Sequence, residues 1–174
     1  MTTWVALLRG VNLGKRQVKS ADLKAAYEAM GFDNVRTLLA SGNVIFDSGG
    51  TPDARKIEAA FKKHFDFESG TILRSQDYLK KLVKSDPFGG VKEDENTKLY
   101  VTLVDDDEAD DLPMPCEMEG DFEVVRLTKG EVFIVTYRKP DGRFSSNLEL
   151  IWKHYGKKRL WTSRNWNTIV KAAS

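Results

Sequence analysis

The same order of expected secondary structure occurs twice along this chain, and this repetition restricts the fold more than any other feature. Gly42 and Gly130 each stand at a hairpin signal between two apolar runs, and they are 88 residues apart (130 − 42). Ser75 and Ser163 each stand at an expected helix start, and they keep the same separation (163 − 75). One offset shared by a hairpin and by a helix predicts an internal duplication.

The first half has the order β-α-β-β-α-β followed by one more helix, which is the ferredoxin-like pattern. Helices are expected after Ser20 as N-cap, from Thr51-Pro52, and after Ser75, and Gly31 is expected to end the first of them. The four strands are expected in short apolar runs, at 4–9, 35–39, 44–46 and 71–73.

The second half repeats this order less regularly. Strands are expected at 99–104, 122–127, 132–137 and 159–161, with a helix through 148–155 and another after Ser163. The stretch 105–112 is short and acidic, with helical character. Arg9 lies 33 residues before its hairpin glycine and Val104 lies 26 before its own, so we place the extra residues of the first half in the loop 10–19.

We therefore predict an α+β fold, a tandem duplication of a ferredoxin-like β-α-β-β-α-β unit with an added C-terminal helix in each copy. The expected parts are a first subdomain at 1–84, a polar connection at 85–96 and a second subdomain at 97–174. The runs at 4–8 and 132–137 are apolar at both alternating positions, so both faces of each sheet should be covered. We infer that the two halves cover each other and pack as one compact protein.

The bulk properties exclude some classes of protein. A net charge of +1 gives no general attraction to nucleic acid or membranes, and bound nucleic acid would need a local basic patch. Cys116 is the single cysteine, which excludes an intrachain disulfide. No apolar run approaches the length of a membrane span, and no signal peptide is evident. We expect a cytoplasmic protein with no membrane partner; its oligomeric state stays open.

Neither a metal nor a cofactor is expected. The acidic run 105–111 lacks the glycine and the spacing of a calcium-binding loop and is typical of a solvated surface. His64 and His154 have no second ligand at a suitable spacing, and Cys116 has no neighbouring base to activate it. No residue has a clear role as nucleophile or base, so the sequence leaves open whether the protein is an enzyme.

The loop after the first strand is the first candidate site. It resembles a P-loop, but three residues instead of four separate its glycines and an arginine follows the lysine. The alternative to an anion-binding loop is a solvated loop whose glycines serve tight turns. If the loop binds an anion, backbone N–H groups and positive side chains would contribute, and the candidates are Arg9, Gly10, Asn12, Gly14, Lys15 and Arg16.

The segment 162–168 is the second candidate site. With Ser163 as N-cap, Arg164 would place a cation in the first helical turn, where it opposes the helix dipole. Such a broken local rule is expected at functional sites. Arg164, Asn165 and Asn167 would then hold a phosphate or a carboxylate beside Ser163. Alternatively, Arg164 pairs with an acid, for example in the run 105–111, and bridges the halves.

Several segments are similar to a known family. The segments are Leu7-Leu8-Arg9-Gly10-Val11-Asn12-Leu13-Gly14, 23–32, Val35-Arg36-Thr37, Ser41-Gly42-Asn43-Val44-Ile45-Phe46 and Thr162-Ser163-Arg164-Asn165-Trp166-Asn167-Thr168. In these the chain resembles the bacterial proteins grouped as domain of unknown function 1697. The resemblance implies a compact duplicated α+β fold and no particular activity. Its motif positions coincide with the two candidate sites.

The favoured function is binding of a small molecule or anion, such as a phosphorylated metabolite or a nucleotide, by the 9–16 loop and the 162–168 segment together. One alternative is a nucleic-acid-binding ferredoxin-like module, which needs exposed aromatic residues on the sheet beside basic ones. The other alternative is a non-catalytic structural or interaction subunit, in which both motifs serve the fold.

Overall fold

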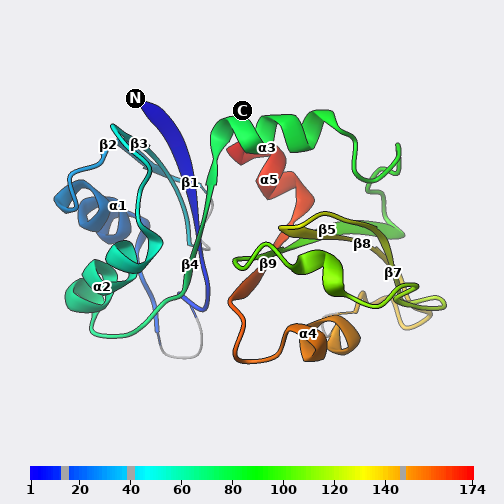
Figure 1. Ribbon diagram of the computed structural model, residues 1–174. Coiled ribbons are helices and arrows are strands. Elements are labelled where there is room, and N and C mark those ends of the chain that lie inside the picture. Colours follow the sequence, from blue (N-terminus) through cyan, green and yellow to red (C-terminus); the bar gives the residue numbers. More distant parts are fainter. Residues whose placement is uncertain (13–15, 39–41, 146–147) are drawn as a thin grey trace. The chain divides into compact units, whose positions relative to one another are not determined.

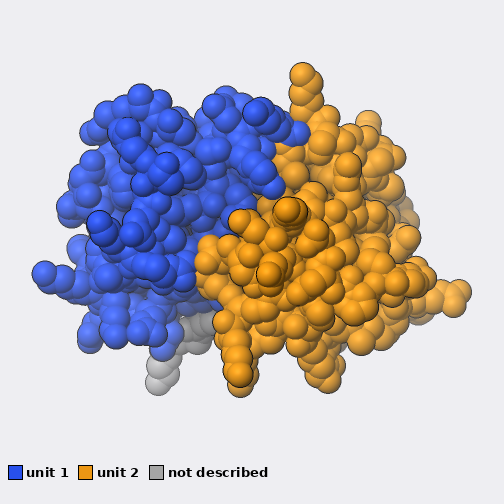
Figure 2. All heavy atoms as spheres, viewed as in Figure 1, with its two compact units in different colours: residues 1–81, 170–174 blue, residues 82–169 orange. Residues whose placement is uncertain are grey.

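The computed structural model describes residues 1–12, 16–38, 42–145 and 148–174. The chain divides into two compact units, one made of residues 1–81 with 170–174 and the other of residues 82–169 (Figure 2). The described residues form five α-helices, a short 3₁₀ helix and two antiparallel sheets (Figure 1). The protein is therefore of mixed α+β architecture.

The first unit contains a four-stranded sheet in the order β2-β3-β1-β4, with every neighbouring pair antiparallel. Helices α1 and α2 cover one face of this sheet (Figure 1), and the core between them includes Tyr27, Phe46 and Phe61. The elements are β1 (Thr2–Leu8), α1 (Ser20–Ala29), β2 (Asp33–Thr37), β3 (Asn43–Ser48), α2 (Ala54–Phe65), β4 (Thr71–Ser75) and α3 (Gln76–Lys84), the last of which continues into the second unit.

The ends of these helices correct two expectations. Helix α1 begins at Ser20 itself, and Lys19 is the N-cap residue, without a capping side-chain bond. Helix α2 begins after Asp53, whose side chain accepts from the amides of Arg55 and Lys56, so the expected Pro52 lies outside the helix. The first N–H groups of a helix have no partner within the helix, and a capping aspartate can accept from two of them. A proline side chain cannot accept a hydrogen bond, so the helix begins after the aspartate.

The second unit contains a five-stranded antiparallel sheet in the order β6-β7-β8-β5-β9. Helix α4 packs on a core that includes Ile134, Ile151 and Tyr155. Where the first unit has α1, this unit has only a 3₁₀ turn, and strand β6 was not expected from the sequence. The elements are β5 (Thr97–Val104), η1 (Ala109–Asp111), β6 (Glu117–Met118), β7 (Phe122–Leu127), β8 (Glu131–Tyr137), α4 (Glu149–Tyr155), β9 (Trp161–Asn165) and α5 (Trp166–Ala172), the last of which continues into the first unit.

The strand registers of the two sheets correspond, but not at one offset. The amide of Leu8 donates to Gly42 and that of Val104 donates to Gly130, so the hairpins keep the separation of 88 residues. In the last strands, Trp4 pairs with Ser75 and Tyr100 pairs with Asn165, which gives 90 (165 − 75). The residue that corresponds to Ser75 is therefore Asn165, and the expected equivalence of Ser75 and Ser163 is wrong by two residues.

Candidate functional site

A small pocket in the second unit is lined by side chains of two aromatic residues and by three consecutive residues of β9. Its volume is about 200 Å³, which suits a ligand smaller than a typical drug-sized molecule. The lining residues are Tyr100 on β5, Ser145, Leu148, Trp152 on α4, and Ser163, Arg164 and Asn165 on β9. Three of the residues selected from the sequence thus lie at one pocket.

Strand β9 does not present those three residues to the same side. Successive side chains of a strand point to opposite faces. Asn165 is paired with Tyr100 and Ser163 with Thr102, and the Ser163 and Thr102 hydroxyls are hydrogen-bonded at 2.7 Å. Arg164 lies on the other face together with Thr162. The expectation that Ser163 caps a helix is wrong, because residues 163–165 are extended and α5 begins at Trp166.

The guanidinium of Arg164 is held close to its own strand. Its Nη1 donates to Thr162 Oγ1 at 2.6 Å and to the Ser163 carbonyl at 2.9 Å. Burial lowers the pKa of Arg164 to about 10, so the group keeps its charge at neutral pH. At the pocket, Arg164 therefore supplies the strand backbone between Ser163 and Asn165. Its positive charge is held on the opposite face of β9.

Glu93, in the segment before β5, accepts hydrogen bonds from the side-chain amides of Asn165 and Asn167, which were expected to bind an external anion. Its Oε1 accepts from Asn165 Nδ2 at 3.0 Å and from the Leu99 amide at 2.9 Å, and its Oε2 accepts from Asn167 Nδ2 at 3.0 Å. Asn165 Oδ1 in turn accepts from the Asn167 amide at 2.9 Å. Both functional ends of the Asn165 carboxamide are thereby engaged, and its orientation at the pocket is fixed.

The aromatic lining of the pocket has two distinct properties. Trp152 is stacked on Trp161 with ring centroids 5.3 Å apart, which fixes the plane of its indole. Its Nε1 is buried and has no hydrogen-bond partner in the part of the chain that the structure describes. Burial, and secondarily the charge of Glu93, raise the pKa of Tyr100, so its hydroxyl stays protonated and can donate.

The first candidate loop lies in the other unit. The carbonyl of Arg9 accepts from Ser69 Oγ at 2.9 Å, and burial lowers the pKa of the Arg9 side chain. Gly10 has a φ of 70°, which favours glycine, and Asn12 Oδ1 accepts from the Val18 amide at 2.9 Å. The side-chain oxygen of Asn12 is therefore used in a hydrogen bond within the loop 10–19.

The remaining loop residues selected from the sequence are only partly described. Gly14 and Lys15 lie outside the described residues, as does Ser41 of the first hairpin. The Arg16 guanidinium lies 4.9 Å from the centroid of the Phe67 ring, a cation–π contact. Arg9, Gly10 and Asn12 belong to the first unit, and Ser163, Arg164, Asn165 and Asn167 to the second.

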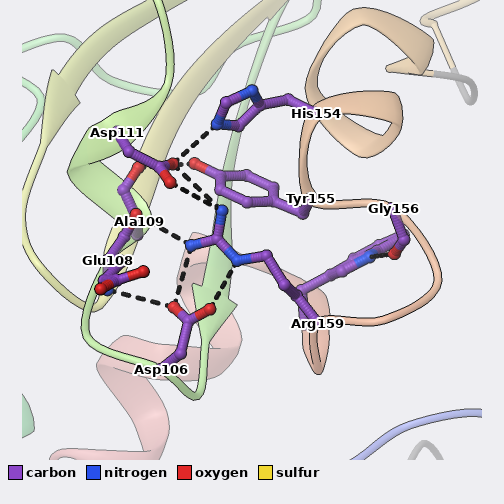
Figure 3. Close-up of polar contacts among 9 residues, drawn as sticks. Asp106, Glu108, Ala109, Asp111, His154, Tyr155, Gly156 and Arg159 are labelled. Atoms are coloured by element: carbon purple, nitrogen blue, oxygen red, sulfur yellow. Dashed lines mark hydrogen bonds and ion pairs between the residues drawn. The ribbon is translucent and has the colours of Figure 1, made fainter.

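The acidic run 105–111 is a bonding partner and not only a solvated surface (Figure 3). Arg159 donates to both carboxylate oxygens of Asp106 and of Asp111, and to the Glu108 carbonyl. His154 Nε2 lies 2.7 Å from Asp111 Oδ1. The arginine that binds this run is thus Arg159, where the sequence suggested Arg164.

A larger hollow of about 480 Å³ lies in the first unit, beside Met30, Phe32 and the start of α2. Its one lining carboxylate, that of Asp53, is engaged as the helix cap. No group of three or more histidine, cysteine, aspartate or glutamate side chains suited to a metal occurs among the described residues. Among the helices that the structure describes, none has the length and apolar composition needed to cross a bilayer.

Sequence reasoning missed Glu93, Tyr100, Trp152 and Arg159. Glu93 stands in a polar connection and Arg159 in a turn, so neither had a local pattern to mark it. Tyr100 and Trp152 fit ordinary strand and helix faces. The alternation of β5 would place Tyr100 on one face, but which residue of β9 pairs with it depends on the register.

The chain is similar over nearly its whole length to the conserved bacterial protein SP0830 from Streptococcus pneumoniae, with 21% identity, a TM-score of 0.71, and coverage of 99% of this chain and 97% of that one. At this identity the likeness concerns the fold alone. No curated protein matches the chain. The family model described as "Protein of unknown function (DUF1697)" matches residues 1–133. The resemblance seen in the sequence is confirmed, and the chain belongs to this family of proteins of unknown function.

Proposed function

We propose that this protein binds a small organic molecule in the pocket between β9, Tyr100 and Trp152. The observation that carries the proposal is the composition of this pocket, which two aromatic residues, Tyr100 and Trp152, line together with three consecutive residues of β9. The fixed indole of Trp152 also offers a flat apolar wall.

The remaining polar groups favour a ligand that carries oxygen acceptors. Tyr100, Ser145 and Ser163 each bring a hydroxyl to the lining. Pockets of this kind bind through a few directed polar groups on a mostly apolar wall. A pocket of about 200 Å³ limits the bound part of the ligand to a small fragment.

Phosphorylated metabolites and nucleotides form a second class of ligand. In the second unit this class is supported by the positive charge that Arg164 keeps, although its guanidinium lies on the face of β9 away from Tyr100 and Asn165. In the first unit, Arg9, Gly10 and Asn12 support the same class, since the loop combines a glycine turn with a basic side chain.

We also infer that the two units arose from one duplicated ferredoxin-like unit. Supporting this, β1 lies between β3 and β4 in the first sheet, as β5 lies between β8 and β9 in the second. The added helices α3 and α5 each begin immediately after the last of these strands.

The experiment is a thermal-shift screen of small neutral, cationic and phosphorylated compounds. A ligand at about 100 times its dissociation constant adds roughly 2.7 kcal/mol, which raises Tm by roughly 5–10 °C for a protein of this size. The rise should shrink in Tyr100→Phe, which loses a pocket hydroxyl. It should persist in Tyr137→Phe, since Tyr137 lies outside the pocket and bonds Glu123.

A flat response to every class of compound would contradict small-molecule binding and support a structural or interaction subunit. A response to short single-stranded RNA alone, weakened by added salt, would instead support the nucleic-acid-binding alternative.

A further inference from the structure

The carboxylate of Glu93 is hydrogen-bonded to neutral donors and not to a positively charged side chain among the described residues. Its three hydrogen-bond donors are the Leu99 amide and the carboxamides of Asn165 and Asn167, at 2.9–3.0 Å. None of the described lysine or arginine residues forms an ion pair with it. Neutral donors stabilise a carboxylate without cancelling its field, so a charge of −1 remains at this position.

That charge stands behind one end of the pocket. Asn165, which lines the pocket, is the direct link, because its Nδ2 is bonded to Glu93. Tyr100 is the cross-strand partner of Asn165. Burial raises the pKa of Tyr100, and the negative charge of Glu93 raises it further.

The same pocket presents aromatic rings. Tyr100 and Trp152 both line it, and the stack on Trp161 holds the indole in place. The face of an aromatic ring is negative and attracts cations, tryptophan most strongly. Two rings and a fixed carboxylate therefore favour the same sign of ligand charge.

Arg164 is the opposing charge in the lining, and its position limits its effect. Its guanidinium is bonded to Thr162 and to the Ser163 carbonyl, on the face of β9 away from Asn165 and Tyr100. The strand backbone thus separates it from the end of the pocket that Glu93 supports.

We propose that the pocket selects a small organic cation, an ammonium group that carries an oxygen acceptor, with Glu93 as the residue that sets this charge preference. The ammonium lies against Tyr100 and Trp152, and the oxygen accepts a hydrogen bond from a hydroxyl of the lining, which includes Tyr100, Ser145 and Ser163. This inference rests on the proposed function and names the ligand class of the same pocket.

The test compares choline with its neutral isostere 3,3-dimethylbutan-1-ol and with inorganic phosphate, by isothermal titration calorimetry on the full chain. The first two have the same shape and differ in charge alone. Wild type should bind choline at least about tenfold more tightly than the isostere, within the range that cation–π and charge attraction provide. In Glu93→Gln the advantage should fall to about threefold or less, while affinity for the isostere stays unchanged. Glu95→Gln is the matched control, since Glu95 is exposed.

Equal binding of choline and the isostere by wild type, or tighter binding of phosphate, would overturn the cation assignment and leave small-molecule binding in place. An unchanged preference in Glu93→Gln would overturn the role of Glu93. If none of the three probes binds and the broader screen is also flat, the proposed function itself fails. The wild-type comparison of the isosteres stays decisive even if Glu93→Gln folds poorly.

Discussion

Arg159 binds Asp111 through both of its carboxylate oxygens, with Nη1 at 3.1 and 2.9 Å from them (Figure 3). Its Nε donates to Asp106 Oδ2 and its Nη2 to Asp106 Oδ1, and its guanidinium lies 4.8 Å from the centroid of the Tyr155 ring. The hydroxyl of Tyr155 donates to the Ala109 carbonyl at 2.6 Å. These bonds tie the turn after β5 to α4 and to the segment before β9, the elements that carry the pocket.

Arg159→Lys should destabilise the protein although it keeps the charge. A lysine cannot supply the planar set of donors that binds two carboxylates and a carbonyl at once. Because Asp106 and Asp111 are partly exposed, at 35% and 45%, solvent screening limits the expected loss to about 1 kcal/mol. Urea unfolding measures it, with the exposed Arg143→Lys as control. Equal midpoints for the two variants would show that the cluster adds nothing to stability.

Acid should weaken the same cluster. The hydrogen bonds from Arg159 hold the pKa of Asp106 below its ordinary value of 3.8. For Asp111, burial acts to raise the pKa, but hydrogen bonds from His154 and Arg159 outweigh it and the pKa is again lowered.

A carboxyl with a lowered folded-state pKa stabilises the fold above its unfolded pKa, and the contribution is lost as pH falls through the folded value. The contribution of this pair should thus be complete at neutral pH and be lost below pH 3.8. Urea midpoints at pH 7 and pH 3 should differ less in Asp106→Asn than in wild type or in Asp107→Asn, whose side chain lies outside the cluster. A pH dependence in Asp106→Asn identical to wild type would refute the assignment.

Gly42→Ala should be strongly destabilising. Gly42 has a φ of +71°, and an added Cβ would lie 3.0 Å from Val11 Cγ2 and 3.2 Å from Leu8 Cβ. The strained backbone and the core contact together should cost about 1–3 kcal/mol. Gly49→Ala is the matched control, because nothing lies within 4 Å of its added Cβ. Thermal unfolding of the two variants tests the difference, and similar Tm values would contradict it.

The strand register predicts which residues cap α3 and α5. Ser75 Oγ accepts from the Tyr78 amide at 3.1 Å, and Asn165 Oδ1 accepts from the Asn167 amide at 2.9 Å. Ser75→Ala should lose about 1 kcal/mol, measured by chemical unfolding. Asn165→Ala should lose at least as much, because it removes the bond to Glu93 together with the cap. Ser163→Ala should lose less, since Ser163 bonds a hydroxyl on β5 and no helical amide. A larger loss in Ser163→Ala would restore the equivalence expected from the sequence.

The sequence anticipated most elements because their signals are local. Phe122–Leu127 was expected as a strand with these bounds, and Gly31 does follow α1. Apolar periodicity depends on the neighbours in the chain, so it can be seen without the fold. The local pattern failed at residues 163–165. These residues resemble the start of a helix, but pairing with β5 keeps them in an extended strand.

What the sequence determined by itself was the mixed α and β composition, the hairpin glycines, the family and a segment, 163–165, that lies at a pocket. Only the tertiary structure decided which side of β9 each residue faces, because one residue of register exchanges the two faces of a strand. It also brought Glu93 to Asn165 and Arg159 to Asp106, pairs separated by 72 and 53 residues. Such pairings depend on chain closure over long loops, which no local pattern of side chains encodes.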